Sequence, residues 1–461
     1  MWRDIHIEEV RTWTRAEWRG GEDLRARLAT GVSTDTRTLE PGEIFVALAG
    51  ERFDGHDHVS EAFERGASSA IVDRRRVDGL RLTGPAKAAC LMVVDSPVRA
   101  LGRMARHYRR RFDLPVVAIT GSSGKTTVKE MVAAVLGRRF RVLKTPENEN
   151  SEIGVPRALL RLSADHSAAV LELAARRVGD IEYLCRVVQP TVGVLLNIGA
   201  AHAGIFGSVE RVAKAKGELL DEIVDESYVA LVNADDCVIA REAKRTKGRL
   251  LGFGWRRESH FSGEGLFLDQ EGCGHFSLQK TTFDLRIPGR HNAHNALAAI
   301  ACARMCGVPL GEASAALGGF QPLHMRSAIL QRRGVRVIDD CYNANPGSVR
   351  AALDLTAEIP VRGRRVAVLG DMMELGEASV SFHEGIGRHA ANRVDVLLGT
   401  GSQSAYTVRA AREAGLDPRR ALHFEDRGEL IHHLEQEVSE GDLVLVKGSR
   451  GMALESVVEA L

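Results

Sequence analysis

Short apolar runs alternate with longer stretches of mixed polarity through most of the chain. In the middle of the sequence such runs fall at residues 116–120, 168–173, 192–196 and 229–232. Runs of this length bounded by turn residues are typical of buried strands, and the segments between them are long enough for helices. The alternation favours a largely parallel sheet with helices on both faces.

Both ends of the chain carry a similar pattern. Near the N-terminus, the apolar run 44–48 precedes a helical segment at 59–66 and a strand-like run at 69–72. Beyond residue 320, strand-like runs again alternate with helical segments, at 335–339, 365–369, 394–398 and 443–446. We therefore predict an α/β protein of three domains: a small N-terminal α/β domain (1–108), a central domain with a mostly parallel sheet (109–320) and a second doubly wound domain (321–461).

Composition agrees with a folded protein of this size. The chain has 461 residues, of which 44% are hydrophobic and 27% charged, and a prior of roughly 150 residues per domain gives about three domains. The 62 basic and 61 acidic side chains leave a formal charge of +1, so overall charge gives no reason to expect nucleic acid or an anionic membrane as a partner. The aromatic content of 5% offers little for base stacking.

The sequence carries no targeting signal that we can identify. Residues 1–18 are charged and lack the apolar core of a signal peptide, and no stretch approaches about 20 uninterrupted apolar residues. The seven cysteines are scattered and form no C-x-x-C pair. We expect a cytoplasmic, monomeric protein with reduced thiols and no membrane segment.

The sharpest local signal is a glycine-rich turn between a predicted strand and a predicted helix. Residues 116–120 run into Gly121, Ser122, Ser123, Gly124, Lys125, Thr126 and Thr127, and the helix-compatible stretch 128–136 follows. Backbone N–H groups in such a loop face a polyphosphate, the lysine supplies a cation and the threonine hydroxyl can ligate Mg²⁺. The pattern is a short G-x-x-G-K-T, because Ile119 stands where the longer loop begins with glycine. The alternative is an ordinary strand–helix turn.

A phosphate loop alone fits kinases, GTPases, motor ATPases and ATP-dependent ligases. The sequence has no D-x-x-G followed by N-K-x-D for guanine recognition, and no apolar strand of the central block ends in the acidic pair of a mechanical ATPase. GTPases and motor ATPases are therefore disfavoured.

Further motifs together resemble the Mur ligase family, and within it the branch that adds D-alanyl-D-alanine. They occur in family order along essentially the whole chain, after the phosphate loop: TPENENSEIGVP at 145–156, NIGAAHAGIFGS at 197–208, AKAKGE at 213–218, GRHNAHN at 289–295, DDCYNANP at 339–346, LGDMMELG at 369–376 and KGSRG at 447–451. The YNANP and GDMMELG runs are the ones that resemble this branch more than its siblings.

The resemblance implies a fold and an activity. The expected fold is an N-terminal domain that holds a UDP-sugar, a central ATPase domain, and a C-terminal ligase domain of dinucleotide-fold type that closes on the nucleotide. The expected activity is ATP-dependent amide ligation through an acyl phosphate, which joins D-alanyl-D-alanine to a UDP-linked muramoyl tripeptide in peptidoglycan precursor synthesis. ATP and Mg²⁺ are the expected cofactors.

The family pattern assigns metal binding to three positions. Thr126 suits a cation between the β- and γ-phosphates. Glu172 ends one predicted strand and His202 follows another, where a parallel sheet places its ligand crevice. Lys216 matches the family lysine that is carbamoylated and then helps to order Mg²⁺; Lys214 is the nearby competitor. With Lys125, Arg326 and Asp340, the residues Glu172, His202 and Lys216 make up the expected catalytic set.

The resemblance also assigns the remainder of the nucleotide site. Asn292 and Asn295 are expected to present amides to the adenine edge, with His291 against the ring; a helix cap with an incidental second asparagine is the alternative. Arg326 matches a residue that reaches the γ-phosphate and Asp340 one that holds the ribose. Tyr342, Asn343 and Asn345 match the wall that meets phosphates and acceptor, and closure of the C-terminal domain would exclude water from the acyl phosphate.

Two N-terminal segments resemble the family's UDP-binding turns. Ser33 and Arg37 belong to the first, and Asp54, Gly55 and His56 form the second. Ordinary turns are the alternative for both. In the central domain, Asn148 and Asn150 match substrate contacts.

Two segments depart from the branch pattern close to the expected active site. Glu147 stands where the family has glycine and Ser151 where it has asparagine, while Ala174 and Arg176 replace a glycine and an asparagine. Arg176 and the following Arg177 either pair with the acidic side chains at 147 and 149 or meet a differently charged substrate.

Three hypotheses follow. The chain is the D-alanyl-D-alanine-adding ligase, a diverged ligase with a different carboxylate or amine substrate, or a nucleotide-binding regulatory protein that has lost catalysis. Retention of the expected catalytic residues argues against the third.

Overall fold

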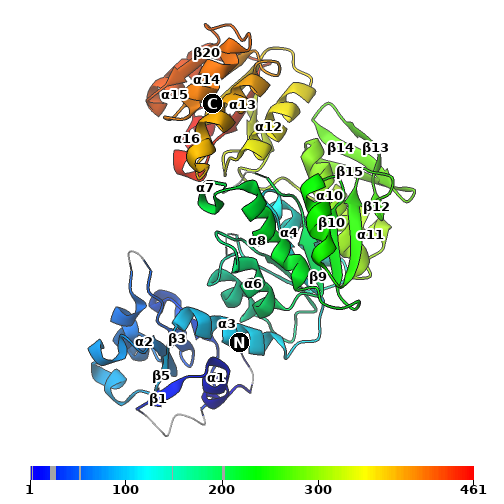
Figure 1. Ribbon diagram of the computed structural model, residues 1–461. Helices are drawn as coiled ribbons and strands as arrows, with labels where there is room; N and C mark the ends of the chain where they lie inside the picture. The colour runs from blue at the N-terminus through cyan, green and yellow to red at the C-terminus, as the bar shows by residue number, and fades with distance from the viewer. Residues whose placement is uncertain (1, 3, 21–26, 51–52, 148, 200–202) are drawn as a thin grey trace. The chain divides into compact units, whose positions relative to one another are not determined.

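The computed structural model describes residues 2, 4–20, 27–50, 53–147, 149–199 and 203–461. Helices and strands alternate through most of these residues as the apolar pattern predicts, and the strands described form four sheets (Figure 1). The α/β fold class is confirmed.

The first sheet has five strands in the order β1-β5-β4-β3-β2. Its strands are β1 (Glu17–Arg19), β2 (Val32–Ser33), β3 (Ile44–Val46), β4 (Ser69–Asp73) and β5 (Leu91–Val94), and the neighbouring helices are α1 (Ile7–Thr14), α2 (Val59–Glu64) and α3 (Pro97–Arg109). Strand β1 is antiparallel to β5, whereas the other pairs are parallel. Phe45, Val59 and Phe63 join one buried apolar cluster, so α2 covers a face of this sheet.

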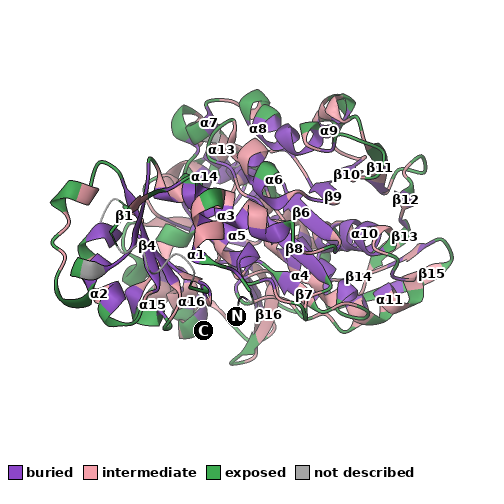
Figure 2. Cartoon of the chain, turned by 90° about the horizontal axis from the view of Figure 1, so that it is seen from below, coloured by how far each residue is buried: buried purple, intermediate pink, exposed green. Residues whose placement is uncertain are grey.

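The second sheet has seven strands in the order β12-β11-β10-β9-β6-β8-β7. The strands are β6 (Val116–Thr120), β7 (Val142–Lys144), β8 (Ala168–Glu172), β9 (Val192–Leu195), β10 (Val229–Asn233), β11 (Arg249–Gly254) and β12 (Phe261–Ser262). All residues of β6 and β8 are buried (Figure 2). Strands covered on both faces need apolar side chains in both directions, which explains their continuous apolar runs.

In the described part of the chain, eight helices are interspersed with these strands or follow them. They are α4 (Lys125–Leu136), α5 (Gly154–Leu159), α6 (Asp180–Val188), α7 (Ala203–Phe206), α8 (Val209–Asp221), α9 (Cys237–Glu242), α10 (Arg290–Met305) and α11 (Leu310–Gly318).

A three-stranded antiparallel sheet, β13-β14-β15, adds to the predicted central domain. It consists of β13 (Glu264–Leu268), β14 (Cys273–Leu278) and β15 (Thr281–Pro288). Side chains along β14 alternate between buried and partly exposed, as expected where one face of an antiparallel sheet meets solvent. Phe276 and Phe283 stack with ring centroids 5.2 Å apart on the buried face.

The fourth sheet has six strands in the order β16-β17-β21-β18-β19-β20, with only β16 antiparallel to its neighbour. Its strands are β16 (Ala328–Arg332), β17 (Val335–Asp339), β18 (Arg365–Gly370), β19 (Val396–Thr400), β20 (Ala421–Phe424) and β21 (Leu443–Lys447). Its helices are α12 (Pro346–Glu358), α13 (Ser379–Ala390), α14 (Ser404–Glu413), α15 (Arg427–Glu437) and α16 (Glu455–Ala460).

Successive side chains of this fourth sheet enter different cores. In β18, Ala367 and Leu369 pack with α12, α13 and α14, whereas Val366 and Val368 pack with α15 and α16. Because neighbouring side chains of a strand point to opposite faces, helices cover both sides of the sheet. This is the doubly wound arrangement predicted for the C-terminal block.

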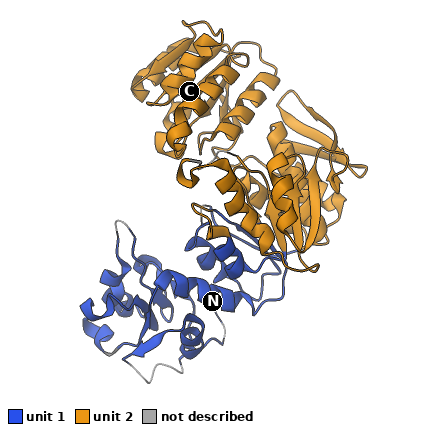
Figure 3. Ribbon diagram, in the orientation of Figure 1, with its two compact units in different colours: residues 1–118, 140–174, 182–191 blue, residues 119–139, 175–181, 192–461 orange. Residues whose placement is uncertain are grey.

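The chain divides into two compact units (Figure 3). The first comprises residues 1–118, 140–174 and 182–191, and the second comprises 119–139, 175–181 and 192–461. Of the helices that the structure describes, none combines the length and apolar character needed to cross a membrane.

Candidate active site

The glycine-rich turn joins a fully buried strand to an amphipathic helix. Strand β6 ends at Thr120 and helix α4 begins at Lys125, with Gly124 at its N-cap. Gly124 has φ +78°, a left-handed conformation that favours glycine. A Cβ there would lie 2.7 Å from Asn295 Oδ1, so the backbone must approach α10 closely. Lys125 Nζ donates to the Gly121 carbonyl at 2.9 Å, which folds the lysine back over the loop.

Asn197 braces this loop, a role that the motif assignment did not single out. Its Oδ1 accepts hydrogen bonds from Ser123 N at 2.8 Å and Ser123 Oγ at 3.2 Å, and its Nδ2 donates to Ser123 O at 3.1 Å. Ser122 N donates to Asn197 O at 3.0 Å, and Gly199 N donates to Ser122 Oγ at 2.9 Å. The segment after β9 therefore fixes both serines of the loop.

The two asparagines of the GRHNAHN motif lie buried in the first two turns of α10. Asn292 Nδ2 donates to Pro288 O at 2.7 Å, and Asn295 Nδ2 donates to Asn292 Oδ1 at 3.0 Å. Asn295 Oδ1 faces Gly124 of the phosphate loop. These bonds tie the turn after β15 to the helix, and their contact with adenine stays a prediction.

Arg326 reaches the phosphate loop from the chain segment before β16. A guanidinium N–H donates to Thr126 Oγ1 at 3.2 Å, and Arg326 Cζ lies 4.0 Å from the centroid of the Tyr342 ring. Its neighbours Met325 and Ser327 have φ of +59° and +56°. Each left-handed residue other than glycine costs on the order of 1 kcal/mol or more, and such strain often accompanies functional sites. The bend aims Arg326 at the loop.

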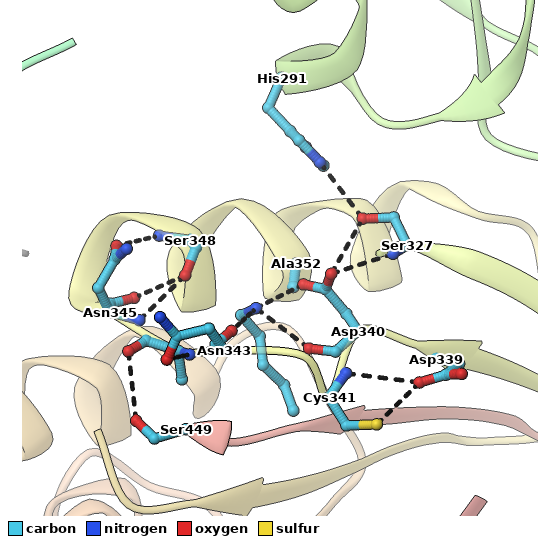
Figure 4. Close-up of polar contacts among 12 residues, drawn as sticks. His291, Ser327, Asp339, Asp340, Cys341, Asn343, Asn345, Ser348, Ala352 and Ser449 are labelled. Carbon is cyan, nitrogen blue, oxygen red and sulfur yellow. Dashed lines mark hydrogen bonds and ion pairs between the residues drawn. The ribbon is translucent and has the colours of Figure 1, made fainter. Parts of the chain in front are cut away.

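Asp340 holds the other side of this bend (Figure 4). Its Oδ1 accepts from Ser327 N at 3.0 Å, and its Oδ2 lies 2.6 Å from Lys447 Nζ. Lys447, only 2% exposed, also donates to Asn343 O at 2.9 Å. His291 Nε2 lies 3.4 Å from Ser327 Oγ, and burial lowers the pKa of His291. Lys447 belongs to the KGSRG motif, but its pairing with Asp340, 107 residues away in the chain, was not predicted.

The two asparagines of the YNANP run serve the local backbone. Asn343 Oδ1 accepts from Ala344 N at 2.9 Å. Asn345 is the N-cap of α12: its Oδ1 accepts from Ser348 N at 2.9 Å, and Ser348 Oγ accepts from Asn345 N at 3.0 Å. This reciprocal pair is a capping arrangement in which serine occupies the third helical position. Contact of either asparagine with substrate stays a prediction.

In the first unit, Glu172 and Asn150 lie together. Glu172 ends β8 with 2% of its surface exposed, and its Oε1 accepts from Asn150 Nδ2 at 2.8 Å. Glu172 N donates to Thr145 Oγ1 at 3.1 Å, which ties β8 to the segment after β7. Among the described residues, no group of three His, Cys, Asp or Glu side chains is placed to hold a metal ion. His202 and Asn148 lie outside the described residues.

The two lysines of α8 differ in burial. Lys216 is 1% exposed, whereas Lys214 is exposed to solvent. Glu218, two residues after Lys216 in the same helix, accepts a hydrogen bond from Gly179 N at 2.6 Å. Burial of a lysine is costly unless its charge is compensated; carbamoylation of Lys216 stays a prediction.

In both predicted UDP-binding turns, side chains form hydrogen bonds within the turn itself. Asp35 accepts from Arg37 through backbone and guanidinium, and the Arg37 side chain lowers the pKa of Asp35 to about 2. Ser33 Oγ donates to Asp35 O at 2.9 Å.

The second turn contains a histidine whose ring is bonded at both nitrogens. Asp73 N donates to His56 Nε2 at 2.9 Å, so that nitrogen is unprotonated and Nδ1 carries the hydrogen that faces Asp54 Oδ1 at 2.6 Å. Gly55 lies directly under the backbone of Leu48, where a Cβ would come within 2.8 Å of Leu48 N. UDP contact by these turns stays a prediction.

The departures from the branch pattern have structural consequences. Glu147, which replaces the family's glycine, has φ +23°. Glu149 Oε1 lies 3.7 Å from both Arg157 and Arg161, and Arg177 Nε lies 3.0 Å from Asp180 Oδ1. Pairing of Arg176 or Arg177 with Glu147 or Glu149, one of the two alternatives for these arginines, stays a prediction.

Three family models match successive parts of the chain. The Mur ligase family catalytic domain matches residues 29–109, the Mur ligase middle domain matches 119–303, and the glutamate ligase domain of Mur ligases matches 325–450.

Relatives and solved structures match nearly the whole chain. A UDP-N-acetylmuramoyl-tripeptide–D-alanyl-D-alanine ligase of Escherichia coli (strain K12) is 39% identical, and one of Bacillus subtilis (strain 168) is 34% identical; the alignments cover 93% and 94% of this chain, respectively, and 93% of each relative. A crystal structure of MurF from Acinetobacter baumannii has a TM-score of 0.87 at 30% identity, covering 98% of this chain and 97% of that one. MurF from Thermotoga maritima in complex with ADP has a TM-score of 0.81 at 30% identity, covering 95% and 98%.

Proposed function

The chain belongs to the Mur ligase family, and from this premise we propose that it joins D-alanyl-D-alanine to UDP-N-acetylmuramoyl-tripeptide with consumption of ATP. The observation that carries the proposal is the identity of 34–39% over at least 93% of the chain with relatives that all bear this one activity in their names. The MurF structure with ADP supports ATP as the nucleotide.

The reaction makes one amide bond and splits one ATP. The terminal carboxylate of the tripeptide accepts the γ-phosphoryl group, which gives an acyl phosphate and ADP. The amine of D-alanyl-D-alanine then attacks the acyl carbon, phosphate leaves, and the amine loses a proton. The product is a peptidoglycan precursor.

The described residues supply electrostatic stabilisation and positioning for phosphoryl transfer. Backbone N–H groups at the start of α4 favour the polyphosphate, and Lys125 swings from the Gly121 carbonyl to the phosphates. Arg326 lies beside Thr126 at the start of α4, so its charge is available to the γ-phosphate. Asp340, held by Lys447, faces the ribose, while Asn292, Asn295 and His291 form the adenine side.

Mg²⁺ and a carbamate are further parts of the proposal. Hard oxygen ligands suit Mg²⁺, and the family pattern assigns it to Thr126, Glu172 and His202. Bound there, the ion supplies Lewis-acid neutralisation of phosphate charge. Carbamoylation of Lys216 would replace a buried cation by an anion suited to ordering the ion.

The remaining assignments concern the sugar nucleotide and the state of the protein. Ser33, Arg37, Asp54, Gly55 and His56 hold the UDP end in the domain at 1–108, the central domain at 109–320 holds ATP, and the domain at 321–461 supplies Arg326 and Asp340. The protein acts in the cytoplasm as a monomer.

ADP release tests the proposal. Purified protein with Mg²⁺ and ATP is assayed with both substrates and with each omitted in turn. We expect repeated turnover, with many ADP released per protein, only when both are present. Repeated turnover that persists without D-alanyl-D-alanine, or that is absent from the complete mixture, contradicts the proposal.

A diverged ligase is the second candidate, because Glu147 occupies a left-handed position where the family has glycine and Glu149 lies with two arginines. Replacing the tripeptide by precursors with other third residues, and the dipeptide by other amines, separates the two. Turnover only with a replacement favours the diverged ligase.

A further inference from the structure

Helix α7 touches the C-terminal ligase block through backbone atoms. Gly204 N donates to the Glu374 carbonyl at 3.0 Å, where Glu374 has a left-handed φ of +63°. A Cβ on Gly204 would overlap Gly376 N and lie 2.6 Å from the Leu375 carbonyl carbon. A Cβ on Gly376 would in turn lie 2.7 Å from Gly204 Cα. The two segments therefore meet at a distance that only glycine at both positions allows.

The ligase side of this contact is fixed by its own core. Leu375 and Met372 are each 2% exposed within the cluster that covers one face of the fourth sheet. Met372 N donates to His383 Nε2 at 3.0 Å, and Met373 N donates to Ser449 Oγ at 2.8 Å. A segment held by buried side chains and backbone bonds cannot retreat cheaply from an added methyl group.

The other side is fixed as well. Phe206, the last residue of α7, is 3% exposed. Gly207 turns with φ +85°, and Ser208 then caps α8 by accepting from Arg211 N at 3.3 Å. Helix α8 carries the buried Lys216. Displacement of α7 thus strains the connection to α8.

A second set of contacts joins the same two blocks near α10. Arg326 reaches Thr126, His291 reaches Ser327, and Arg290 Nε lies 2.6 Å from Glu358 Oε1 on α12. Helices α7 and α10 approach the C-terminal block at separate places (Figure 1). Two separated contacts fix an orientation that one contact alone leaves free.

We propose that Gly204 and Gly376 are positioning residues for ligation. Their backbone contact sets how the C-terminal ligase block, residues 321–461, docks on the block that carries the phosphate loop. It thereby sets where Arg326 lies relative to that loop. The activity readout rests on the proposed function. A misplacement of about 1 Å costs on the order of 100-fold in rate.

Gly204→Ala is the test, because alanine is the better helix former by about 1 kcal/mol and Gly204 has no left-handed φ. Gly311→Ala is the matched control: Gly311 is also helical, and nothing lies within 4 Å of its added Cβ. We expect kcat for ADP release to fall at least tenfold in Gly204→Ala, with the Kd for ADP and the melting temperature unchanged. Gly311→Ala should match the wild type. A kcat within twofold of wild type overturns the proposal.

Amide hydrogen exchange keeps the test independent of the substrates and of the variant's folding. In the wild-type protein with ADP, the Gly204 amide should exchange slowly because it donates to Glu374; Gly204→Ala should exchange faster in 203–207. Fast exchange of the Gly204 amide in the wild-type protein overturns the proposed contact, even if the ligase assay detects no ADP release. If the Gly204 amide exchanges slowly but no ADP is released in the ligase assay, the contact stands and the proposed substrates are contradicted.

Discussion

The phosphate loop and the cluster around Asp340 belong to the same candidate site but are built in different ways. The loop is a contiguous run whose backbone N–H groups and one lysine are proposed to bind phosphate, and Asn197 braces it from the segment after β9. The Asp340 cluster is assembled from α10, the bend at Ser327 and the end of β21, and depends on a buried ion pair with Lys447. The first needs local geometry, whereas the second needs the whole fourth sheet.

We therefore expect changes in the two regions to affect different properties: nucleotide binding for the loop, and placement of the C-terminal block for the Asp340 cluster. Damage to the loop should weaken nucleotide binding while leaving the fold intact. Damage to the cluster should lower stability of the C-terminal block and misplace Arg326.

Breaking the buried ion pair should have the largest effect. Lys447→Met leaves the Asp340 carboxylate without its cation, and removal of one partner of a buried pair costs about 3–5 kcal/mol. Urea unfolding measures the loss in the free energy of unfolding. Asp340→Asn combined with Lys447→Met should lose less than the sum of the single variants. Arg419→Met, which removes an exposed pair with Asp417, should cost about 0–1 kcal/mol; an equal loss from both sites contradicts the account.

Removing the loop lysine should come next. Lys125→Ala eliminates the cation proposed to bind the phosphates, and loss of one such electrostatic contact lowers turnover by roughly 100- to 1,000-fold. Steady-state ADP release measures it, with the melting temperature unchanged. Lys247→Ala, an exposed lysine elsewhere, should leave turnover intact. Turnover within threefold of wild type for Lys125→Ala would remove the loop from the mechanism.

Removing the brace should have an intermediate effect. Asn197→Ala deletes three hydrogen bonds to Ser123, and exposing or orphaning such groups costs about 1–3 kcal/mol. Calorimetric titration should show ADP binding weakened by roughly 5- to 150-fold. Asn233→Ala removes a buried asparagine that donates to Leu196 O and should lower stability without this loss of affinity. Equal ADP affinities for the two variants would refute the bracing role.

Protonation of His291 should give the smallest effect. Burial lowers its pKa in the folded protein, so between the folded value and the ordinary value of about 6.5 the unfolded chain binds more protons. Stability contributed by this residue is therefore complete at neutral pH and falls as pH drops below about 6.5. His291→Gln should flatten that part of the stability curve measured by urea unfolding from pH 7 to 5. An unchanged slope would exclude His291 as its source.

The sequence predicted best what is local. Strand β6 and the loop follow from an apolar run next to glycines, and β17 begins and ends where its apolar run does. The antiparallel sheet β13–β15 was not predicted, although β14 alternates with period two, because its strands lack the continuous apolar runs that mark the parallel strands of the central block. The strand β16 was missed for a related reason: its residues are partly exposed at an edge.

The candidate site was predictable only to the extent that its residues lie in recognisable runs. The brace from Asn197 and the ion pair of Lys447 with Asp340 join residues 74 and 107 positions apart, and no local pattern encodes such pairs. The cap formed by Asn345 shows the converse: a residue in a family motif can serve the backbone of its own helix.

The most direct measurement is the mass and stoichiometry of the product. Protein is incubated with ATP, Mg²⁺, UDP-N-acetylmuramoyl-tripeptide and D-alanyl-D-alanine, and the nucleotide-linked peptide is weighed by mass spectrometry while ADP is counted. The account predicts a gain of one D-alanyl-D-alanine less one water, with one ADP per product. ADP formed without that gain in mass, or a gain in mass without ADP, would contradict the assignment of this chain as an ATP-dependent D-alanyl-D-alanine-adding ligase.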